Sequence, residues 1–425
     1  MNAPLQISEH RALVEAVATP LPTVLRPLLT DVGSMQPNCF GTILAEPVAA
    51  VLEVPPFTNS ARGGFAVRRD DIAEATAGHP VSLPVAGDIV AGDTAGHELR
   101  PGTAWRIMTG APVPYGADTV VELDHTDHRA GVPELPATVQ ITACPQLGAN
   151  IRVKGEDVSA GTVVLKAGRL LDPAALACAV SVGHGQVRVH PRPRIGIITT
   201  GDELVAPGEQ PRAGQIPDSN GILLTALVAQ AGGALVARLR AHDDPAALRA
   251  QLENWSEVDL IITAGGISRG AHEVVRQALS DPTMSFYQVS QQPGGPQGVG
   301  TVHLGDRDVP VLCLPGNPVS AFVCFHLYVA GAIAMMAARR IDSRPRGHDV
   351  VVGAGWKSPA AQTQFTPVSL LAGTVSPIHR LVSGSHLVAS LPLADGLAIV
   401  PDGVDHVSAG QHLRFINTRE GNINV

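Results

Sequence analysis

Residues 192–204 read RPRIGIITTGDEL, and this stretch decides the fold of the largest unit in the chain. Its apolar run, residues 195–199, is short and ends in a turn that contains Gly201. A short apolar run bounded by a glycine turn is typical of a strand buried on both faces, as in a parallel sheet. The run therefore predicts an α/β unit with helices on both sides of a sheet.

The segments that follow alternate between helix and strand. In order they are a helix at 222–233, a strand at 234–244, a helix at 245–255, a strand at 259–270, and a strand, turn and helix at 309–327. This rhythm predicts a parallel, doubly wound α/β domain at about 191–340. On either side of it, residues 48–150 and 345–425 consist of short Val-, Pro- and Gly-rich runs, which predict β domains.

The composition excludes several classes of function. The 425 residues carry a net charge of −8 without Lys/Arg clusters, which argues against nucleic-acid binding and against an anionic membrane surface. Five cysteines without a CxxC motif favour reduced thiols in a cytoplasmic protein. Only 16% of residues are charged, which indicates either surface hidden in an oligomer or a bias toward Ala, Gly and Pro. The apolar run 322–338 follows a Pro/Gly turn and contains His326, so we expect a buried core helix rather than a membrane span.

Three strand ends carry small residues where a ligand binds in open α/β sheets. They are residues 199–203 (TTGDE), 265–268 (GGIS) and 314–318 (LPGNP). Glycines there allow the main chain to approach a ligand, and the helix that follows points its N–H groups at an anion. Ordinary turn chemistry between strand and helix is the alternative.

Two acidic segments are candidates for a cation. Asp157 lies in a glycine-bounded turn, and Glu203 lies at the first strand end. Carboxylates at turns can hold Mg²⁺ through one or two oxygens, although they can equally be solvated residues or helix caps.

Taken together and in order, eight motifs resemble the MoeA family, which comprises the bacterial molybdopterin molybdenumtransferases and the E domain of gephyrin. The motifs are VPPFTNSA (54–61), RIMTGA (106–111), Arg152 with GED (155–157), TGDEL (200–204), DSN (218–220), GGIS (265–268), LPGNP (314–318) and SG (383–384). The resemblance covers almost the whole chain.

The resemblance implies an elongated four-domain subunit that forms a homodimer. A split domain I would comprise 1–47 and 153–190, and a β-rich domain II would comprise 48–152. The molybdopterin-binding α/β domain III would be 191–340, and the C-terminal β domain IV would be 345–425.

The resemblance also implies a reaction, in which molybdate is inserted into adenylylated molybdopterin with release of AMP and the help of Mg²⁺. Thr109, Asp157 and Glu203 match the catalytic residues, and Asp157 and Glu203 match the metal-handling ones. The residues implied for the nucleotide and pterin pocket are Gly201, Asp202, Ser219, Asn220, Gly265, Gly266, Ser268, Glu273, Pro315, Gly316, Asn317 and Pro318.

The sequence departs from the family pattern at charged positions. An acidic residue of the family is Gly63 here, with Arg62 beside it. Another acidic position is Ala271, leaving only Glu273 nearby. The family's Lys-Pro-Gly-Lys-Pro segment has become QPGGP (292–296), so Gln292 and Gly295 replace both lysines.

The lost lysines matter because the implied substrate is strongly anionic. Hydrogen bonds to charged groups contribute about 1.5–3 kcal/mol each, so losing two weakens binding by about 10²–10⁴-fold. Arg62 and Arg269 either replace this charge or are surface residues of a site no longer used.

Two functions from different classes follow. The first is a molybdenumtransferase with a retuned site. The second is a gephyrin-like dimeric scaffold that binds a partner peptide, such as the C-terminal tail of the division protein FtsZ, and links it to a membrane receptor. Its groove would lie between domains III and IV, near residues 322–328 and 367–379. Arginines that face the domain III pocket would favour the enzyme, and arginines that face solvent would favour the scaffold.

Overall fold

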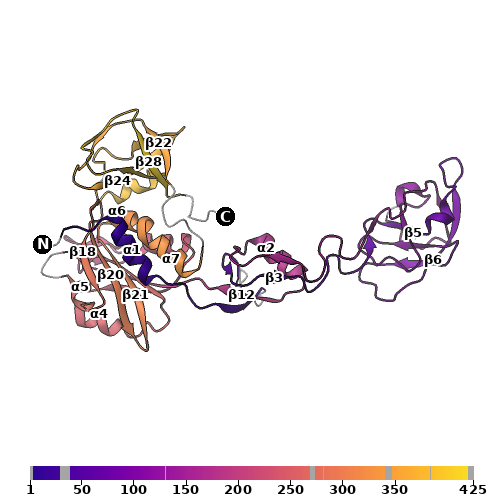
Figure 1. Ribbon diagram of the computed structural model, residues 1–425, viewed down its shortest axis with the longest axis horizontal. Coiled ribbons are helices and arrows are strands. Elements are labelled where there is room, and N and C mark those ends of the chain that lie inside the picture. The colour runs from indigo at the N-terminus through magenta and orange to yellow at the C-terminus, as the bar shows by residue number, and fades with distance from the viewer. Residues whose placement is uncertain are drawn as a thin grey trace.

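The computed structural model describes residues 3–28, 39–129, 131–268, 273–280, 282–339, 347–382 and 384–419. The molecule is elongated (Figure 1). An α/β domain and the C-terminal β domain form one end, a slender central domain follows, and a second β domain forms the far end. The four units lie along the molecule as the family resemblance implies.

The α/β domain is built on a six-stranded mixed sheet. Its spatial order is β16 (Ala234–Ala241), β13 (Arg194–Thr200), β17 (Leu260–Ala264), β21 (Arg307–Leu314), β20 (Pro296–Leu304) and β18 (Ser285–Gln288). The first four strands run parallel, β20 runs antiparallel to β21, and β18 runs antiparallel to β20 and so in the direction of the first four. The chain passes from β20 to β21 through a tight turn at Gly305, where φ is 64°, and such a turn can join only antiparallel strands. The parallel strands were predicted from the sequence, and the antiparallel edge was not.

Helices cover both faces of this sheet because its strand residues alternate between two cores. Ile195 and Ile197 pack with α3 (Ser219–Gln230) on one face, whereas Ile198 packs with α4 (Pro245–Leu252) and α5 (Val274–Ala278) on the other. This arrangement confirms the doubly wound α/β domain.

The apolar run after the third strand end is one continuous helical segment, made of α6 (Pro318–Cys324), a π-helical stretch (Phe325–Val329) and α7 (Ala330–Met336). By length and composition it could cross a membrane, but 78% of it is buried inside the protein. Against it packs α1 (Ile7–Val17), which opens the chain but sits on the α/β domain (Figure 1). The segment is therefore a core helix, as the sequence predicts.

The other domains are small sheets. The central domain contains β1 (Val24–Pro27), β12 (Gln186–His190), β2 (Ile43–Leu44), β3 (Val48–Ala49), β11 (Val163–Leu165) and α2 (Pro173–Ser181). The distal sheet is β8 (Thr119–Glu122), β5 (Gly64–Val67), β7 (Ala104–Ile107), β6 (Val81–Ile89) and β9 (Thr138–Ile141), and β4 (Asn59–Ser60) pairs with β10 (Ile151–Arg152) next to it. The C-terminal sheet is β19 (Gln291–Gln292), β24 (Thr363–Leu371), β25 (Thr374–Pro377), β22 (His348–Val352), β28 (His412–Asn417) and β26 (Gly396–Val400).

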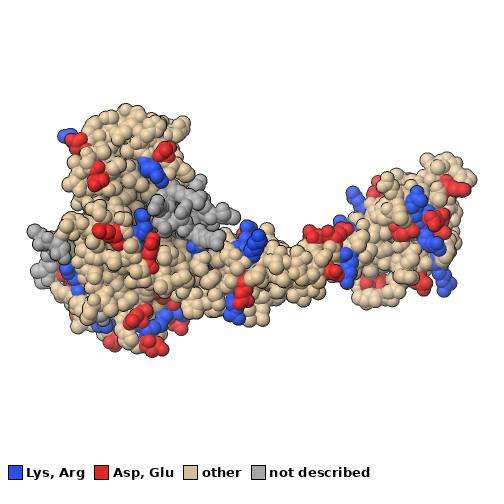
Figure 2. Space-filling model, viewed as in Figure 1, with Lys and Arg blue, Asp and Glu red and all other residues tan. Residues whose placement is uncertain are grey.

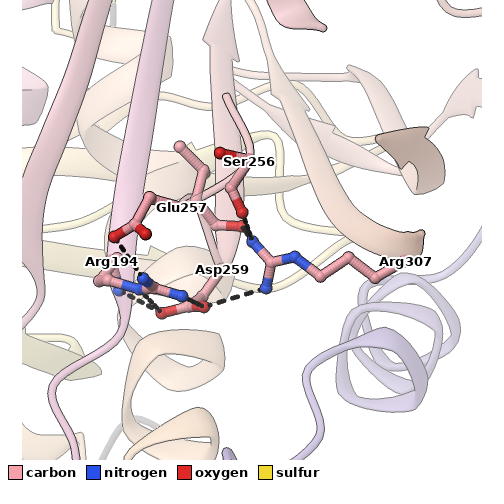
Figure 3. Close-up of polar contacts among 6 residues, drawn as sticks. Arg194, Ser256, Glu257, Asp259 and Arg307 are labelled. Atoms are coloured by element: carbon pink, nitrogen blue, oxygen red, sulfur yellow. Dashed lines mark hydrogen bonds and ion pairs between the residues drawn. The ribbon is translucent and has the colours of Figure 1, made fainter. Parts of the chain in front are cut away.

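An ion cluster fixes the amino ends of three strands of the α/β sheet (Figure 3). Asp259 precedes β17 and is only 7% exposed. Its Oδ1 lies 2.9 Å from Nη2 of Arg194 and 3.4 Å from Nη1 of Arg307, the first residues of β13 and β21. These side chains lie at the edge opposite the carboxyl ends, so they hold the sheet and leave the ligand-binding edge free.

Candidate active site

A cavity of about 1100 Å³ opens at the carboxyl ends of β13, β17 and β21. The C-terminal domain closes one side of it with Ser385 and His386. The cavity brings together these residues matched by the family resemblance: Glu203, Ser219, Asn220, Gly265, Gly266, Ser268, Glu273, Pro315, Gly316, Asn317 and Pro318. Residues predicted from three separate strand ends therefore share one site.

Glycines let the three strand ends meet. A Cβ added to Gly201, where φ is +141°, would lie 2.2 Å from Oε2 of Glu203, so that carboxylate lies against the glycine. A Cβ on Gly265 or Gly266 would lie 2.9 Å from Oγ1 of Thr200. Side chains at Gly265 and Gly266 would force the ends of β13 and β17 apart, which is the physical reason for the glycines there.

Asp218 is a structural residue of the cavity wall. Its Oδ1 accepts the N–H of Gly221 at 2.9 Å, and its Oδ2 accepts the hydroxyl of Thr199 at 2.8 Å. Asp218 thereby caps α3, and its carboxylate is committed to the fold.

Asn220 combines a structural bond with a free acceptor. Its Nδ2 donates to the carbonyl of Gly316 at 2.6 Å, which ties the first turn of α3 to the third strand end. Its Oδ1 is buried and has no partner among the described residues. Buried acceptors are rarely left unpaired, so Asn220 is suited to receive a hydrogen bond from a ligand.

Two residues predicted for the pocket, Gly201 and Asp202, lie outside the cavity lining. Asp202 is 65% exposed at its side chain, and its Oδ1 pairs with Nδ1 of His242 at 2.9 Å, which lowers the pKa of Asp202. Asp202 and Gly201 are not among the residues that line the cavity. Glu273 lines it, and its Oε2 accepts the N–H of Ser268 at 2.7 Å.

The charge of the cavity is unusual for an anion site. No Lys or Arg lines it within the described residues, whereas Glu203, Asp218 and Glu273 do. On the face shown in Figure 2, acidic and basic side chains are mixed over every domain. An adjoining cavity of about 600 Å³ shares Gln292 with the main one and contains Lys357 and Arg380.

The cavity can offer a divalent cation one free carboxylate. The described residues contain no cluster of three or more His, Cys, Asp or Glu side chains placed to hold a metal ion. The Glu203 carboxylate lines the cavity and has no hydrogen-bond partner among them. Mg²⁺ commonly binds through one or two carboxylates together with substrate phosphates, so Glu203 fits this mode.

Thr109 and Asp157 lie away from the cavity of their own chain. Thr109 follows β7 in the distal domain, where its Oγ1 is 3.9 Å from a Cβ built on Gly63. Asp157 donates its N–H to the carbonyl of Val54 at 3.0 Å, between the distal and central domains. Figure 1 shows the distal domain separated from the α/β domain by the central domain, so one chain does not bring Thr109 and Asp157 to Glu203.

Of the two arginines whose direction was to distinguish the enzyme from the scaffold, only Arg62 lies among the described residues. The side chain of Arg62 is 67% exposed on the distal domain, and its Nε lies 3.9 Å from Oε1 of Glu122. It faces solvent and not the cavity of its own chain. Arg269, Ala271 and Ser383 lie outside the described residues.

The groove expected for a peptide is nearly filled. Phe325 and Tyr328 are 1% and 2% exposed, because they belong to the core. Between Val319, Pro367 and His379 a space of only about 10 Å³ remains. This is about the volume that one water molecule requires.

Sequence reasoning missed the C-terminal contribution to the cavity and the buried amides behind its wall. Ser385 and His386 follow the Ser-Gly motif closely, so that motif was the available signal. Gln291 and Gln297 are each 1% exposed. Glutamines are usually exposed, and nothing in the sequence marks these two as buried.

Comparisons with known proteins agree with this geometry over the whole chain. Residues 5–183 match the MoeA N-terminal region (domain I and II), 196–335 match a probable molybdopterin binding domain, and 349–417 match the MoeA C-terminal region (domain IV).

Relatives and solved structures are similar along nearly their full lengths. Molybdopterin molybdenumtransferase 2 of Mycobacterium tuberculosis is 40% identical over 96% of this chain and 98% of its own. Molybdopterin molybdenumtransferase of a Nostoc species is 33% identical over 87% of this chain and 85% of its own. A crystal structure of the molybdopterin biosynthesis MoeA protein of Pyrococcus horikoshii, 26% identical, superimposes with a TM-score of 0.75 over 98% of this chain and 99% of that one. With its four domains, its strand-end cavity and these matches, the chain belongs to the MoeA family.

Proposed function

We propose that this protein is a molybdopterin molybdenumtransferase, which inserts molybdenum from molybdate into adenylylated molybdopterin and releases AMP. The observation that carries the proposal is the cavity of about 1100 Å³ at the carboxyl ends of β13, β17 and β21, within the matched molybdopterin binding domain. Its volume exceeds the range of about 300–1,000 Å³ typical of ligand pockets and suits a substrate as large as a pterin joined to a nucleotide.

The residues of the cavity have distinct roles in this proposal. The turns at Gly265 and Gly316 let a flat ring approach the main chain, and Asn220 Oδ1 accepts a hydrogen bond from a ring or ribose donor. Glu203 would hold Mg²⁺ together with substrate phosphates, and the cation would neutralise phosphate charge.

A second copy of the chain completes the site in this proposal. The central domain exposes four large apolar side chains, Val51, Leu52, Val163 and Val180, which are 62%, 49%, 53% and 49% exposed. A contiguous exposed apolar surface commonly marks a protein interface. A homodimer formed there would let Thr109 and Asp157 of one chain reach the cavity of the other, which their own chain cannot arrange.

By the criterion given above, the exposed Arg62 favours the peptide scaffold, but the other observations favour the enzyme. The expected groove retains about 10 Å³, and the relatives that match the full chain are named molybdenumtransferases. The reaction would take place in the cytoplasm, where the five free cysteines stay reduced.

The test is turnover by the purified protein. It is supplied with adenylylated molybdopterin, Mg²⁺ and molybdate, and AMP release is followed by chromatography. We expect release that depends on molybdate and saturates with substrate. A protein that binds the nucleotide substrate but releases no AMP beside an active family member would contradict the proposal.

A further inference from the structure

Residues 54–64, at the junction of the distal and central domains, contact both predicted catalytic residues that lie away from the cavity. The carbonyl of Val54 accepts the N–H of Asp157 at 3.0 Å. At the other end of the segment, a Cβ built on Gly63 would lie 3.9 Å from Oγ1 of Thr109. A surface that receives Thr109 and Asp157 therefore also receives this segment.

Arg62 belongs to the segment, and its main chain is fixed relative to Thr109. Ser60 is fully buried, and its hydroxyl donates to the carbonyl of Arg62 at 2.5 Å. The carbonyl of Ser60 in turn accepts the N–H of Gly110, which follows Thr109, at 2.8 Å. Arg62 and Thr109 are thus held at the same end of the distal sheet.

The guanidinium group of Arg62 has no structural task. Its side chain is 67% exposed, and its Nε lies 3.9 Å from Oε1 of Glu122, which is beyond hydrogen-bond distance. It donates no hydrogen bond to any described residue. Arg106 in the same sheet differs, because its guanidinium lies 2.6 Å from the Asp88 carboxylate and donates to the carbonyls of residues 132–134.

Gly63 leaves this positive charge without an acidic neighbour on one side. The family resemblance expects an acidic residue at this position. Packing does not require glycine there, because a Cβ on Gly63 would meet nothing closer than 3.9 Å, and its φ is not positive. Compared with the family pattern, the charge beside Thr109 has therefore changed from negative to positive.

The cavity of the α/β domain has the opposite deficit. Glu203, Asp218 and Glu273 line it, and no Lys or Arg does so in the described part of the chain. An anion removed from water without a cationic partner is strongly disfavoured. The phosphates of the proposed substrate therefore need positive charge from outside this wall, in addition to a cation held at Glu203.

We infer that Arg62 of one subunit enters the cavity of its partner and donates hydrogen bonds to a phosphate of the bound nucleotide. The inference rests on the proposed function, in which a homodimer brings Thr109 and Asp157 of one chain to the cavity of the other. Arg62 shares their segment and arrives with them. A guanidinium presents two parallel N–H groups to a phosphate, so Arg62 contributes mainly to substrate affinity.

The first test is calorimetric titration of the full-length protein with AMP in the presence of Mg²⁺. Arg62→Met keeps the length of the side chain and removes its charge, and the exposed position leaves the fold intact. We expect AMP to bind about tenfold more weakly or worse, with a shallower dependence on salt, and Arg62→Lys to recover part of the loss.

Arg100→Met is the matched control. Arg100 is exposed on the same domain but precedes β7, whereas Thr109 follows it, so the two residues lie at opposite ends of this strand. The control should bind AMP as the unmodified protein does. Equal AMP affinities of Arg62→Met and Arg100→Met would overturn the inference.

The second test asks which cavity Arg62 serves, in mixed dimers purified through a different affinity tag on each chain. One pairing joins an unmodified chain to a chain with both Arg62→Met and Glu203→Gln. Its only cavity with the Glu203 carboxylate faces the substituted position 62, so we expect KM for the nucleotide substrate to rise about tenfold. The reverse pairing joins an Arg62→Met chain to a Glu203→Gln chain and should keep the KM of the unmodified protein. The same KM in both pairings would rule out action between chains.

The outcomes also separate this inference from the proposed function. AMP affinity that depends on Arg62, without AMP release in the turnover assay, refutes the function and leaves the role of Arg62 in phosphate binding. Turnover with an unchanged KM in Arg62→Met refutes the inference and leaves the function. A protein that binds no AMP, or that sediments as a monomer in analytical ultracentrifugation, refutes the inference directly.

Discussion

At the scale of single residues, the Glu203 carboxylate is the group least occupied by the fold. It lies against Gly201 and has no hydrogen-bond partner among the described residues, whereas Asp218 and Glu273 each accept an N–H group. A carboxylate without a structural task can be altered without unfolding the protein. This freedom makes Glu203 a clean probe of the proposed chemistry.

We expect Glu203→Gln to lower kcat by about 100-fold or more while the melting temperature stays within a few degrees, because the amide keeps the shape but cannot neutralise a cation. Steady-state AMP release measures the effect. Glu209→Gln is the matched control, because that exposed side chain accepts only the N–H of Ala206 and an amide oxygen can accept it equally well. Full activity of Glu203→Gln would remove it from the mechanism.

At the scale of elements, the amino ends of β13, β17 and β21 depend on one buried carboxylate. Asp259→Ala leaves Arg194 and Arg307 without their shared partner, although both are more than one third exposed and water screens part of the loss. We expect the free energy of unfolding to fall by about 2–3 kcal/mol, measured by urea denaturation. Glu257→Ala, whose side chain is 81% exposed, should change it by less than about 1 kcal/mol.

Two histidines in the helical layer predict a loss of stability in acid. Burial lowers the pKa of His10 and of His326 to about 4, below the ordinary value of 6.5. Between pH 6.5 and 4 the unfolded chain therefore binds protons that the folded chain does not. The free energy of unfolding consequently decreases as the pH is lowered through this range. The loss at pH 5 is about 2 kcal/mol for each histidine.

His326→Phe tests this prediction. The Nε2 of His326 is buried without a partner among the described residues, and its ring packs edge-on against the rings of Phe322 and Phe325. The variant should be at least as stable as the unmodified protein at pH 7.5 and should lose about half of the decline at pH 5. Hydrogen exchange of the β13 amides, corrected for its intrinsic pH dependence, measures both. An unchanged decline would contradict the assignment.

At the scale of the whole molecule, the distance between the distal domain and the cavity predicts complementation between inactive variants. Glu203→Gln removes the carboxylate in the cavity of one chain. Asp157→Asn removes the carboxylate that the second chain would bring to that cavity. In a mixed dimer one of the two sites combines an intact cavity with an intact Asp157. After mixing and subunit exchange, half of the dimers are mixed, and one of the two sites in each mixed dimer is intact. We therefore expect about a quarter of the AMP release of the unmodified protein. Each variant alone stays inactive. No recovery in verified mixed dimers would mean that the site does not form between chains.

The strands of the α/β sheet differ in how well they could be predicted from the sequence. The short apolar runs near Ile195, Leu260 and Leu312 predicted the strands, because burial on both faces leaves a continuous signal in the sequence. The antiparallel strand β20 contains two glycines and three polar residues, and its register comes from pairing with β21, which no local pattern shows.

The site was predictable where a motif marks a strand end. Glu203, Gly265 and Gly316 meet because parallel strands end at the same edge of a sheet. The direction of the Pro293 and Gly294 carbonyls was not predictable, because Gln291 and Gln297 set it through hydrogen bonds from buried side chains. Such contacts depend on packing between distant segments.

The strand β19 belongs by sequence to the α/β domain but is hydrogen-bonded into the C-terminal sheet, where Gln291 lies opposite Thr363 and Gln292 opposite Gln364. Pro293 and Gly294, which line the cavity, follow this strand directly. The C-terminal sheet therefore holds this part of the cavity wall directly, so any change in the position of the C-terminal domain would also change the shape of the cavity.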